Sequence, residues 1–188
     1  VAWDFAEMPS LLLENWAWEP AVLATFAFHY ETGEPIPPEY LQKLAASRHF
    51  MPATNHMRSL CVAKLDLEMH MHYDEKFAGK DLDAAAAEML APYTAPFSVQ
   101  VPCIMRNLLH CFQGGYAAGY YTYKWSETLA ADAFSRFRKE GIFNAETGAE
   151  YRKVILEPGA SRPADVIFRE FIGRDVNPEA LFESQGLK

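Results

Sequence analysis

Residues 114–141 read GGYAAGYYTYKWSETLAADAFSRFRKEG, and this stretch decides the fold class. The pattern predicts a long helix over 116–140, entered through two glycines and ended by Gly141 as a C-cap glycine. Working outward, helical patterns predict further helices at 9–18, 21–28, 39–47, 55–73, 81–90, 107–112, 146–156, 163–172 and 178–183. Only 97–101 resembles a strand, and no repeat or linker interrupts the chain. We therefore expect an all-α, irregular multi-helix fold in which 1–188 form part of one domain.

Composition excludes several classes of function. The 188 residues carry 17 basic and 25 acidic side chains, a net charge of −8 without a basic cluster, which argues against nucleic acid and anionic membranes. No apolar run reaches bilayer-spanning length, and no signal peptide is visible. Three cysteines without a C-x-x-C pair are typical of buried thiols in a reducing compartment. The chain lacks an initiator Met, which indicates processing or excision from something longer.

Three tyrosines form the first candidate site. On a helix, Tyr116, Tyr120 and Tyr123 would lie within about 60° of one another, while Tyr121 and Trp125 would face the opposite side. Three hydroxyls beside a flexible glycine pair can donate hydrogen bonds to a substrate carbonyl as it becomes an oxyanion. The alternative is an aromatic packing ridge.

Two carboxylates form the second candidate site. Glu7 and Glu14 would lie about 20° apart on a helix face that also carries Leu11. A carboxylate buried among Leu and Trp must be paired or must bind a metal, whereas the alternative is a solvated face.

The histidines give a weaker signal. His70 and His72 diverge on a helix and cannot chelate one ion, whereas Asp66 and His70 are four residues apart and can touch. Neither E-x-x-H nor H-E-x-x-H occurs, which excludes a di-iron carboxylate bundle and a complete zincin site.

Four blocks resemble the M3 family of zinc metallopeptidases, and the resemblance covers essentially the whole chain. The blocks are residues 7–18, 29–35, 110–125 and 131–136, and residues 141–148 look most like the oligopeptidase A branch. The resemblance implies a zinc-dependent oligopeptidase that cleaves short peptides in the cytoplasm. The alternative, from another class, is a non-catalytic helical interaction module.

The resemblance also implies roles for individual residues. Asp4-Phe-Ala-Glu7-Met-Pro-Ser10 matches the family motif D-F-x-E-x-P-S, whose glutamate is the third zinc ligand, so Glu7 is implied as a metal ligand. Glu14 is implied, more weakly, as a carboxylate that supports the ligands or the fold. The remaining implied site residues are His110, Tyr116 and Tyr123 in transition-state binding, and Tyr120, Gly114 and Gly115 in substrate binding.

This sequence also departs from the family pattern. Leu11 stands where many relatives have Gln, and Cys111 and Gln113 are unusual in the loop that closes on peptide. Family members place H-E-x-x-H, with two histidine ligands and the glutamate base, shortly before the region where this chain begins. We therefore expect a C-terminal part of the catalytic domain. Alone it should be inactive and prone to self-association, and its partners should be peptides and the missing N-terminal part of the same polypeptide.

Overall fold

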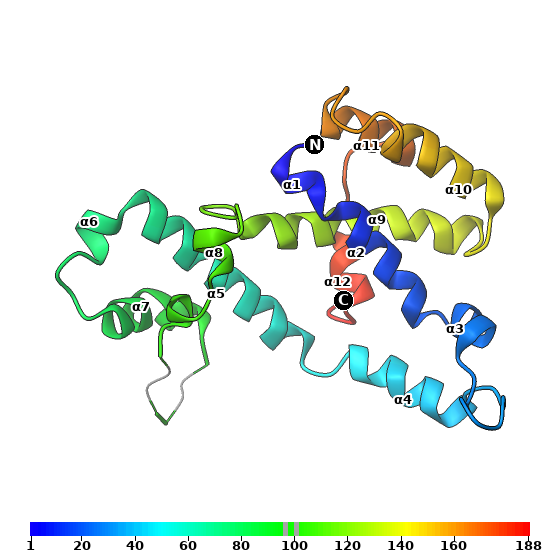
Figure 1. Cartoon of the computed structure of the whole chain (residues 1–188), viewed down its shortest axis with the longest axis horizontal. Coiled ribbons are helices and arrows are strands. Elements are labelled where there is room, and N and C mark those ends of the chain that lie inside the picture. The colour runs from blue at the N-terminus through cyan, green and yellow to red at the C-terminus, as the bar shows by residue number, and fades with distance from the viewer. Residues whose placement is uncertain (96–97, 100–101) are drawn as a thin grey trace. The chain divides into compact units, whose positions relative to one another are not determined.

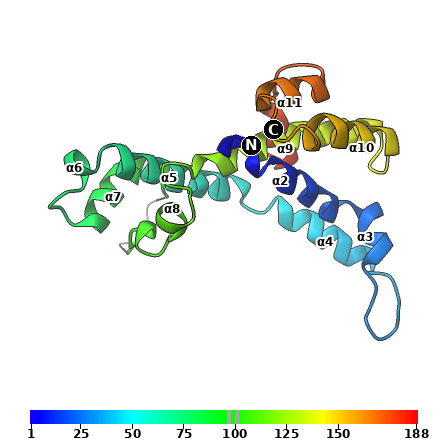
Figure 2. The same ribbon diagram turned by 45° about the horizontal axis from the view of Figure 1, so that its top comes forward.

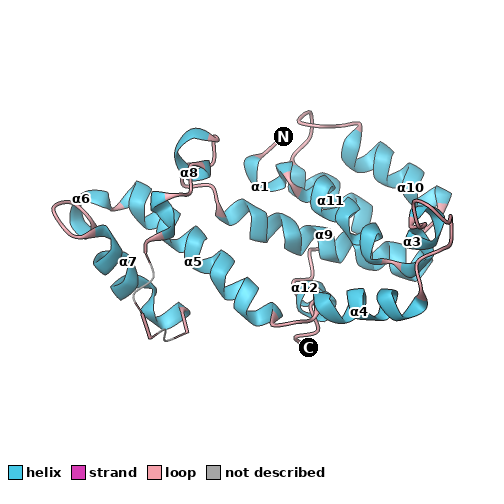
Figure 3. Ribbon diagram, turned by 60° about the horizontal axis from the view of Figure 1, so that its bottom comes forward, coloured by secondary structure: helices cyan, strands magenta, loops and turns pink. Residues whose placement is uncertain are grey.

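Helices dominate the chain, as predicted. The computed structural model describes residues 1–95, 98–99 and 102–188, and Figure 3 shows helices joined by loops within those ranges. An isolated antiparallel bridge joins Phe28 and Pro35. Of the predicted strand at 97–101, Phe97, Gln100 and Val101 lie outside the described residues. The all-α fold class is confirmed.

The elements follow one another along the chain without long interruptions in the described ranges. In order they are α1 Trp3–Ala6, α2 Met8–Glu14, η1 Asn15–Trp18, α3 Pro20–Phe26, α4 Pro38–Arg48, α5 Pro52–Met71, α6 Tyr73–Lys76, α7 Leu82–Leu90, η2 Ala91–Tyr93, η3 Ile104–Arg106, α8 His110–Gln113, α9 Tyr121–Glu140, α10 Ala145–Tyr151, the π-helical η4 Arg152–Leu156, α11 Ala164–Ile172 and α12 Glu179–Ser184. Most predicted helices are present with small shifts of their ends. The exceptions are α9, which begins at Tyr121 and not at Tyr116, and the helix predicted over 107–112, where α8 begins only at His110.

The chain divides into two compact units, a boundary that the sequence did not indicate. The first unit combines residues 1–52 with 125–188, and the second comprises residues 53–124. The first unit is built from two segments that are separated in the sequence by the second unit. No shift in composition marks where one unit ends and the other begins.

The core of the first unit forms where α2, α10 and α11 pack around α9 (Figure 1). Trp16 meets Phe134 and Phe137 edge-on, with ring centroids 4.8 and 4.7 Å apart, and its indole N–H donates to the carbonyl of Ile142. The buried core side chains include Met8, Leu12, Leu129, Phe134, Phe137, Ile155, Ile167 and Phe171.

The second unit packs around Leu65 of α5, and Figure 2 shows α7 lying beside α5. The α7 helix begins where Asp81 accepts a hydrogen bond from the Ala84 amide at 2.8 Å, as an N-cap aspartate should. The buried side chains are Leu65, Phe77, Ala86, Cys103, Met105 and Cys111. This unit contains His110 and all three predicted tyrosines.

Candidate functional site

The chain reverses direction where α8 ends, at Gly114 and Gly115. Gly115 has φ +80°, a left-handed conformation that side chains other than glycine rarely adopt. A Cβ on Gly114 would lie 3.0 Å from the His110 carbonyl oxygen, a tight contact that would require a small shift of the backbone. The left-handed conformation therefore favours glycine at 115, and the close contact favours it at 114.

Residues 116–120, here called the tyrosine turn, lead from this reversal into α9. They form hydrogen-bonded turns and not helix, and Ala118 takes the left-handed φ of +53°. The prediction that Tyr116, Tyr120 and Tyr123 lie along one helix face is therefore wrong for the first two residues. The Gly119 amide donates to the Tyr116 carbonyl at 2.9 Å, which bends the backbone where a helix was expected.

The turn nevertheless brings together the four side chains that the sequence singled out. The His110 and Tyr116 rings stack with centroids 4.7 Å apart, and Tyr116 stacks on Tyr123 at 5.1 Å. The ring centroids of Tyr120 and Tyr123 are 5.4 Å apart, and the two ring planes are inclined at 59°. We call His110, Tyr116, Tyr120 and Tyr123 the aromatic cluster. Tyr121 and Trp125, predicted to face away, are exposed.

The polar atoms of the cluster are positioned to donate hydrogen bonds. His110 Nε2 and Tyr123 Oη are 2.6 Å apart. When Nε2 carries a proton, it donates to Tyr123, and the phenol proton of Tyr123 is then available to another acceptor. Burial raises the pKa of Tyr120, partly opposed by the charge of Arg58, so its phenol is protonated at neutral pH.

A buried carboxylate on α5 accepts hydrogen bonds from the backbone of the tyrosine turn. Asp66 is fully buried and accepts hydrogen bonds from the Ala118 amide at 3.1 Å and the Tyr120 amide at 2.9 Å. His70 Nδ1 lies 3.0 Å from the same carboxylate, which confirms the predicted Asp66–His70 contact. The sequence spacing pointed only to that pair. The two backbone bonds join residues more than fifty positions apart and leave no local signal.

The two predicted acidic residues lie in the first unit. Glu7 sits at the junction of α1 and α2, and the Ser10 hydroxyl donates to its carboxylate at 3.0 Å and to its carbonyl at 2.9 Å. Pro9 in the first turn of α2 suits a helix start here. Glu7 is half-buried, whereas Glu14 ends α2 exposed to solvent. Glu14 therefore fits a solvated position.

The described residues do not contain a complete metal site. No three His, Cys, Asp or Glu side chains among them gather closely enough to hold an ion. A carboxylate such as that of Glu7 suits zinc as one oxygen ligand, but a catalytic zinc site takes three protein ligands. Among the described residues, the predicted ligand Glu7 therefore has no second and third ligand gathered around it.

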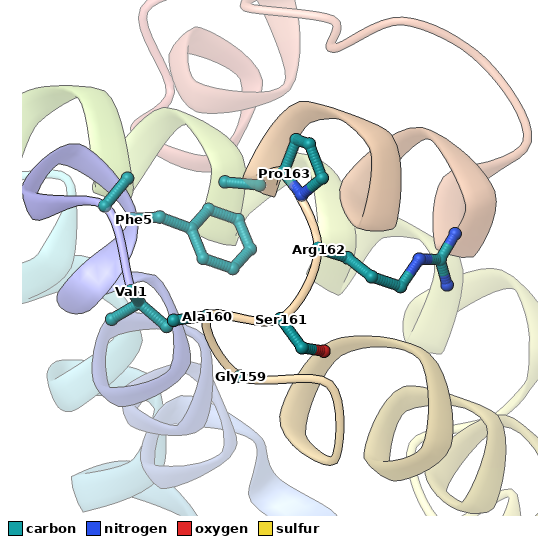
Figure 4. Close-up of a pocket in the computed structure, with 9 residues that line it drawn as sticks. Val1, Phe5, Gly159, Ala160, Ser161, Arg162 and Pro163 are labelled. Atoms are coloured by element: carbon teal, nitrogen blue, oxygen red, sulfur yellow. The ribbon is translucent and has the colours of Figure 1, made fainter.

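A cavity of about 320 Å³ lies elsewhere in the first unit (Figure 4). It is lined by Val1, Phe5 and the loop before α11, and it contains none of the predicted site residues. Its one charged side chain, Arg162, points away from Phe5 and pairs with Glu170. Its remaining wall is largely apolar or backbone.

Within the described ranges, no helix combines the length and apolar character needed to cross a bilayer.

Comparison with known proteins places these features in a family. The profile of peptidase family M3 matches residues 1–187. Oligopeptidase A of Escherichia coli (strain K12) is 41% identical over 190 residues, covering 100% of this chain and 28% of that protein. Dipeptidyl carboxypeptidase of the same strain is 32% identical over 98% of this chain and 27% of its own length. Saccharolysin of Saccharomyces cerevisiae is 29% identical over 100% of this chain and 26% of its own. The chain spans little more than a quarter of these relatives, and because the match runs along all of it, the chain belongs to peptidase family M3.

Proposed function

We propose that this chain is the part of a zinc-dependent oligopeptidase that binds the peptide and stabilises its transition state. The observation that carries the proposal is the aromatic cluster, in which an imidazole and three phenols from α8, the tyrosine turn and α9 converge. The names of the relatives, oligopeptidase A and dipeptidyl carboxypeptidase, support peptides as substrates. Two Arabidopsis thaliana relatives, each 37% identical, are named a probable cytosolic and an organellar oligopeptidase A, and the first supports the predicted cytoplasmic location.

The hydroxyl donors do the chemical work of this part. As a nucleophile attacks a peptide carbonyl, negative charge develops on the carbonyl oxygen, and Tyr123 and Tyr116 donate hydrogen bonds to it. His110 Nε2, when protonated, donates a hydrogen bond to the Tyr123 hydroxyl oxygen 2.6 Å away, which leaves the phenol proton free to bond to the substrate. Tyr120, Gly114 and Gly115 line the approach of the peptide. Such donors act mainly in the transition state, because the oxyanion exists only there.

One residue of this chain would bind the zinc ion. Glu7 would supply one oxygen ligand, and the other ligands and the general base would come from the remainder of the protein. Zinc, when bound, polarises the carbonyl and lowers the pKa of water. Glu14, exposed at the end of α2, would influence the ligands only from outside their coordination shell.

The test uses the complete protein that contains this chain. We expect Tyr123→Phe and Tyr116→Phe each to lower kcat by about 100- to 1000-fold, with little change in KM, because each removes one oxyanion donor. The assay is cleavage of a quenched short peptide, with a chelator added in parallel.

Tyr121→Phe is the matched control, because Tyr121 is an exposed neighbour outside the cluster. It should keep wild-type kcat. If both cluster variants kept wild-type kcat, the tyrosines would have only a packing role, as the alternative interpretation holds. A folded protein without chelator-sensitive cleavage would favour the interaction module.

A further inference from the structure

One side chain holds the backbone on which the aromatic cluster is built. Asp66 has no exposed surface, yet it carries a carboxylate, and a buried charge is tolerated only when hydrogen bonds satisfy it. Its Oδ1 accepts from the Ala118 amide and its Oδ2 accepts from the Tyr120 amide. Both amides belong to the tyrosine turn, where the backbone leaves its expected helical path.

The same carboxylate also reaches the segment that carries His110. The buried thiol of Cys111 donates a hydrogen bond to Asp66. Burial, with the charge and hydrogen bond of Asp66 as further causes, raises the pKa of that thiol to about 12, so it remains a donor. Cys111 directly follows His110. Asp66 therefore links the two segments that supply the cluster.

His70 completes the arrangement on α5. Its Nδ1 lies 3.0 Å from Asp66 Oδ1 and 2.8 Å from the Asp66 carbonyl oxygen. The imidazole side chain is 24% exposed and lies against Phe112, with ring centroids 5.5 Å apart. It connects the buried carboxylate to the surface of the unit.

We infer that Asp66 is the positioning residue of the tyrosine turn, holding Tyr116, Tyr120 and Tyr123 beside His110 before a peptide binds. The inference rests on the proposed function for its catalytic consequence but not for the anchoring itself. The donors that converge on the carboxylate are two amides, a thiol and an imidazole. An amide side chain cannot replace it, because its NH₂ group would face one of these donors.

The first test measures the turn directly, by hydrogen–deuterium exchange, in the complete protein that contains this chain. Asp66→Asn should speed exchange of the amides in 116–120 by at least tenfold, because two of them lose their acceptor. Asp132→Asn is the matched control. Asp132 is also fully buried and accepts from the Asn177 amide at 2.8 Å, but it lies in the first unit. Unchanged exchange in Asp66→Asn, or equal acceleration in Asp132→Asn, would overturn the inference.

The second test measures catalysis in the complete protein. Asp66→Asn should lower kcat at least tenfold and change KM little, while Asp132→Asn keeps kcat. In the Tyr116→Phe, Tyr123→Phe background, Asp66→Asn should cost less than threefold further, because the donors it positions are already gone. A full additional loss in that background would show that Asp66 acts on something else.

A second variant and a second comparison cover the cases in which Asp66→Asn does not fold or the proposed function fails. If Asp66→Asn does not fold, Asp66→Glu keeps the buried charge and shifts the oxygens by one methylene. Asp66→Glu should increase the hydrogen–deuterium exchange rate of the amides in 116–120 and lower kcat. Wild-type values of both quantities would overturn the inference. If Tyr123→Phe itself keeps wild-type kcat, the proposed function fails, and exchange alone decides whether Asp66 anchors the turn.

Discussion

The chemistry of the candidate site depends on single protons on a few side chains. Burial raises the pKa of Tyr120 further above neutral pH, and a protonated His110 Nε2, 2.6 Å from the Tyr123 hydroxyl, would leave the Tyr123 proton available to another acceptor. Phenols that remain protonated are donors at neutral pH. An oxyanion requires such donors.

At the same scale, Glu7→Gln should weaken zinc binding by the complete protein. The change removes an anionic ligand oxygen and keeps the shape of the side chain. The loss should therefore exceed the roughly 10- to 100-fold effect typical of groups that only support a ligand. Bound zinc after dialysis is the measurement. Glu39→Gln, in the exposed first turn of α4, is the control and should keep its zinc. Equal zinc in both variants would remove Glu7 from the metal site.

Among the elements, the reversal between α8 and α9 matters most for the site. Gly115 at φ +80° and Ala118 at φ +53° turn the backbone twice in the left-handed region, so that Tyr116 stacks on His110 while Tyr123 is still on α9. Hydrogen bonds to Asp66 secure this path. A helix continued through 116–120 would not make those bonds.

The α10 helix offers an element-scale test of stability. Asn144 caps it by accepting from the Glu146 amide at 2.9 Å and the Thr147 amide at 3.2 Å. Asn144→Ala should lower the free energy of unfolding by about 1 kcal/mol, because both amides lose their acceptor. Urea denaturation measures this, and Asn144→Ser should recover most of the loss. Equal stability of the Ala and Ser variants would show that the cap contributes nothing.

For the molecule as a whole, buried acids should make folding sensitive to alkali. Burial raises the pKa of Cys111, in the second unit, and of Tyr151, in the first, to about 12 each. In the unfolded chain these groups release protons near pH 9 to 10, whereas the folded chain holds them until about 12. The unfolded state then binds fewer protons, so stability should fall as pH rises from about 9 to 12. Urea midpoints across this range measure the fall, and Cys111→Ala with Tyr151→Phe should flatten it. A wild-type midpoint that stays constant would contradict the prediction.

The 188-residue chain by itself should show no peptidase activity, because its described residues gather no three metal ligands. It should also self-associate. Trp3 near the start of the chain is exposed, whereas Phe5 is buried in the core and Tyr116 is half-buried. Other exposed aromatic side chains of the first unit include Phe26, Phe28, Tyr30, Tyr40 and Phe50.

A quenched peptide with added zinc, assayed beside light scattering, tests both claims about the isolated chain. The complete protein is the positive control for activity. Chelator-sensitive turnover by the chain alone would contradict the first claim, and a monomer across concentrations would contradict the second.

The sequence by itself determined the helical class and most helix positions. It also singled out the members of the aromatic cluster, the tyrosines by their spacing and His110 by the family resemblance. Helix periodicity, proline and glycine act over a few residues, so their consequences can be read locally. For the same reason, the Asp66–His70 contact followed from a spacing of four.

Only the tertiary structure decided how the cluster forms and which group anchors it. Tyr116 and Tyr120 reach Tyr123 through a turn and not along a helix, because the Ala118 and Tyr120 amides bond to a carboxylate on α5. The division into two units likewise arises because residues 1–52 pack with 125–188. Bonds between residues far apart in sequence leave no periodic trace, because they depend on how the elements pack in space.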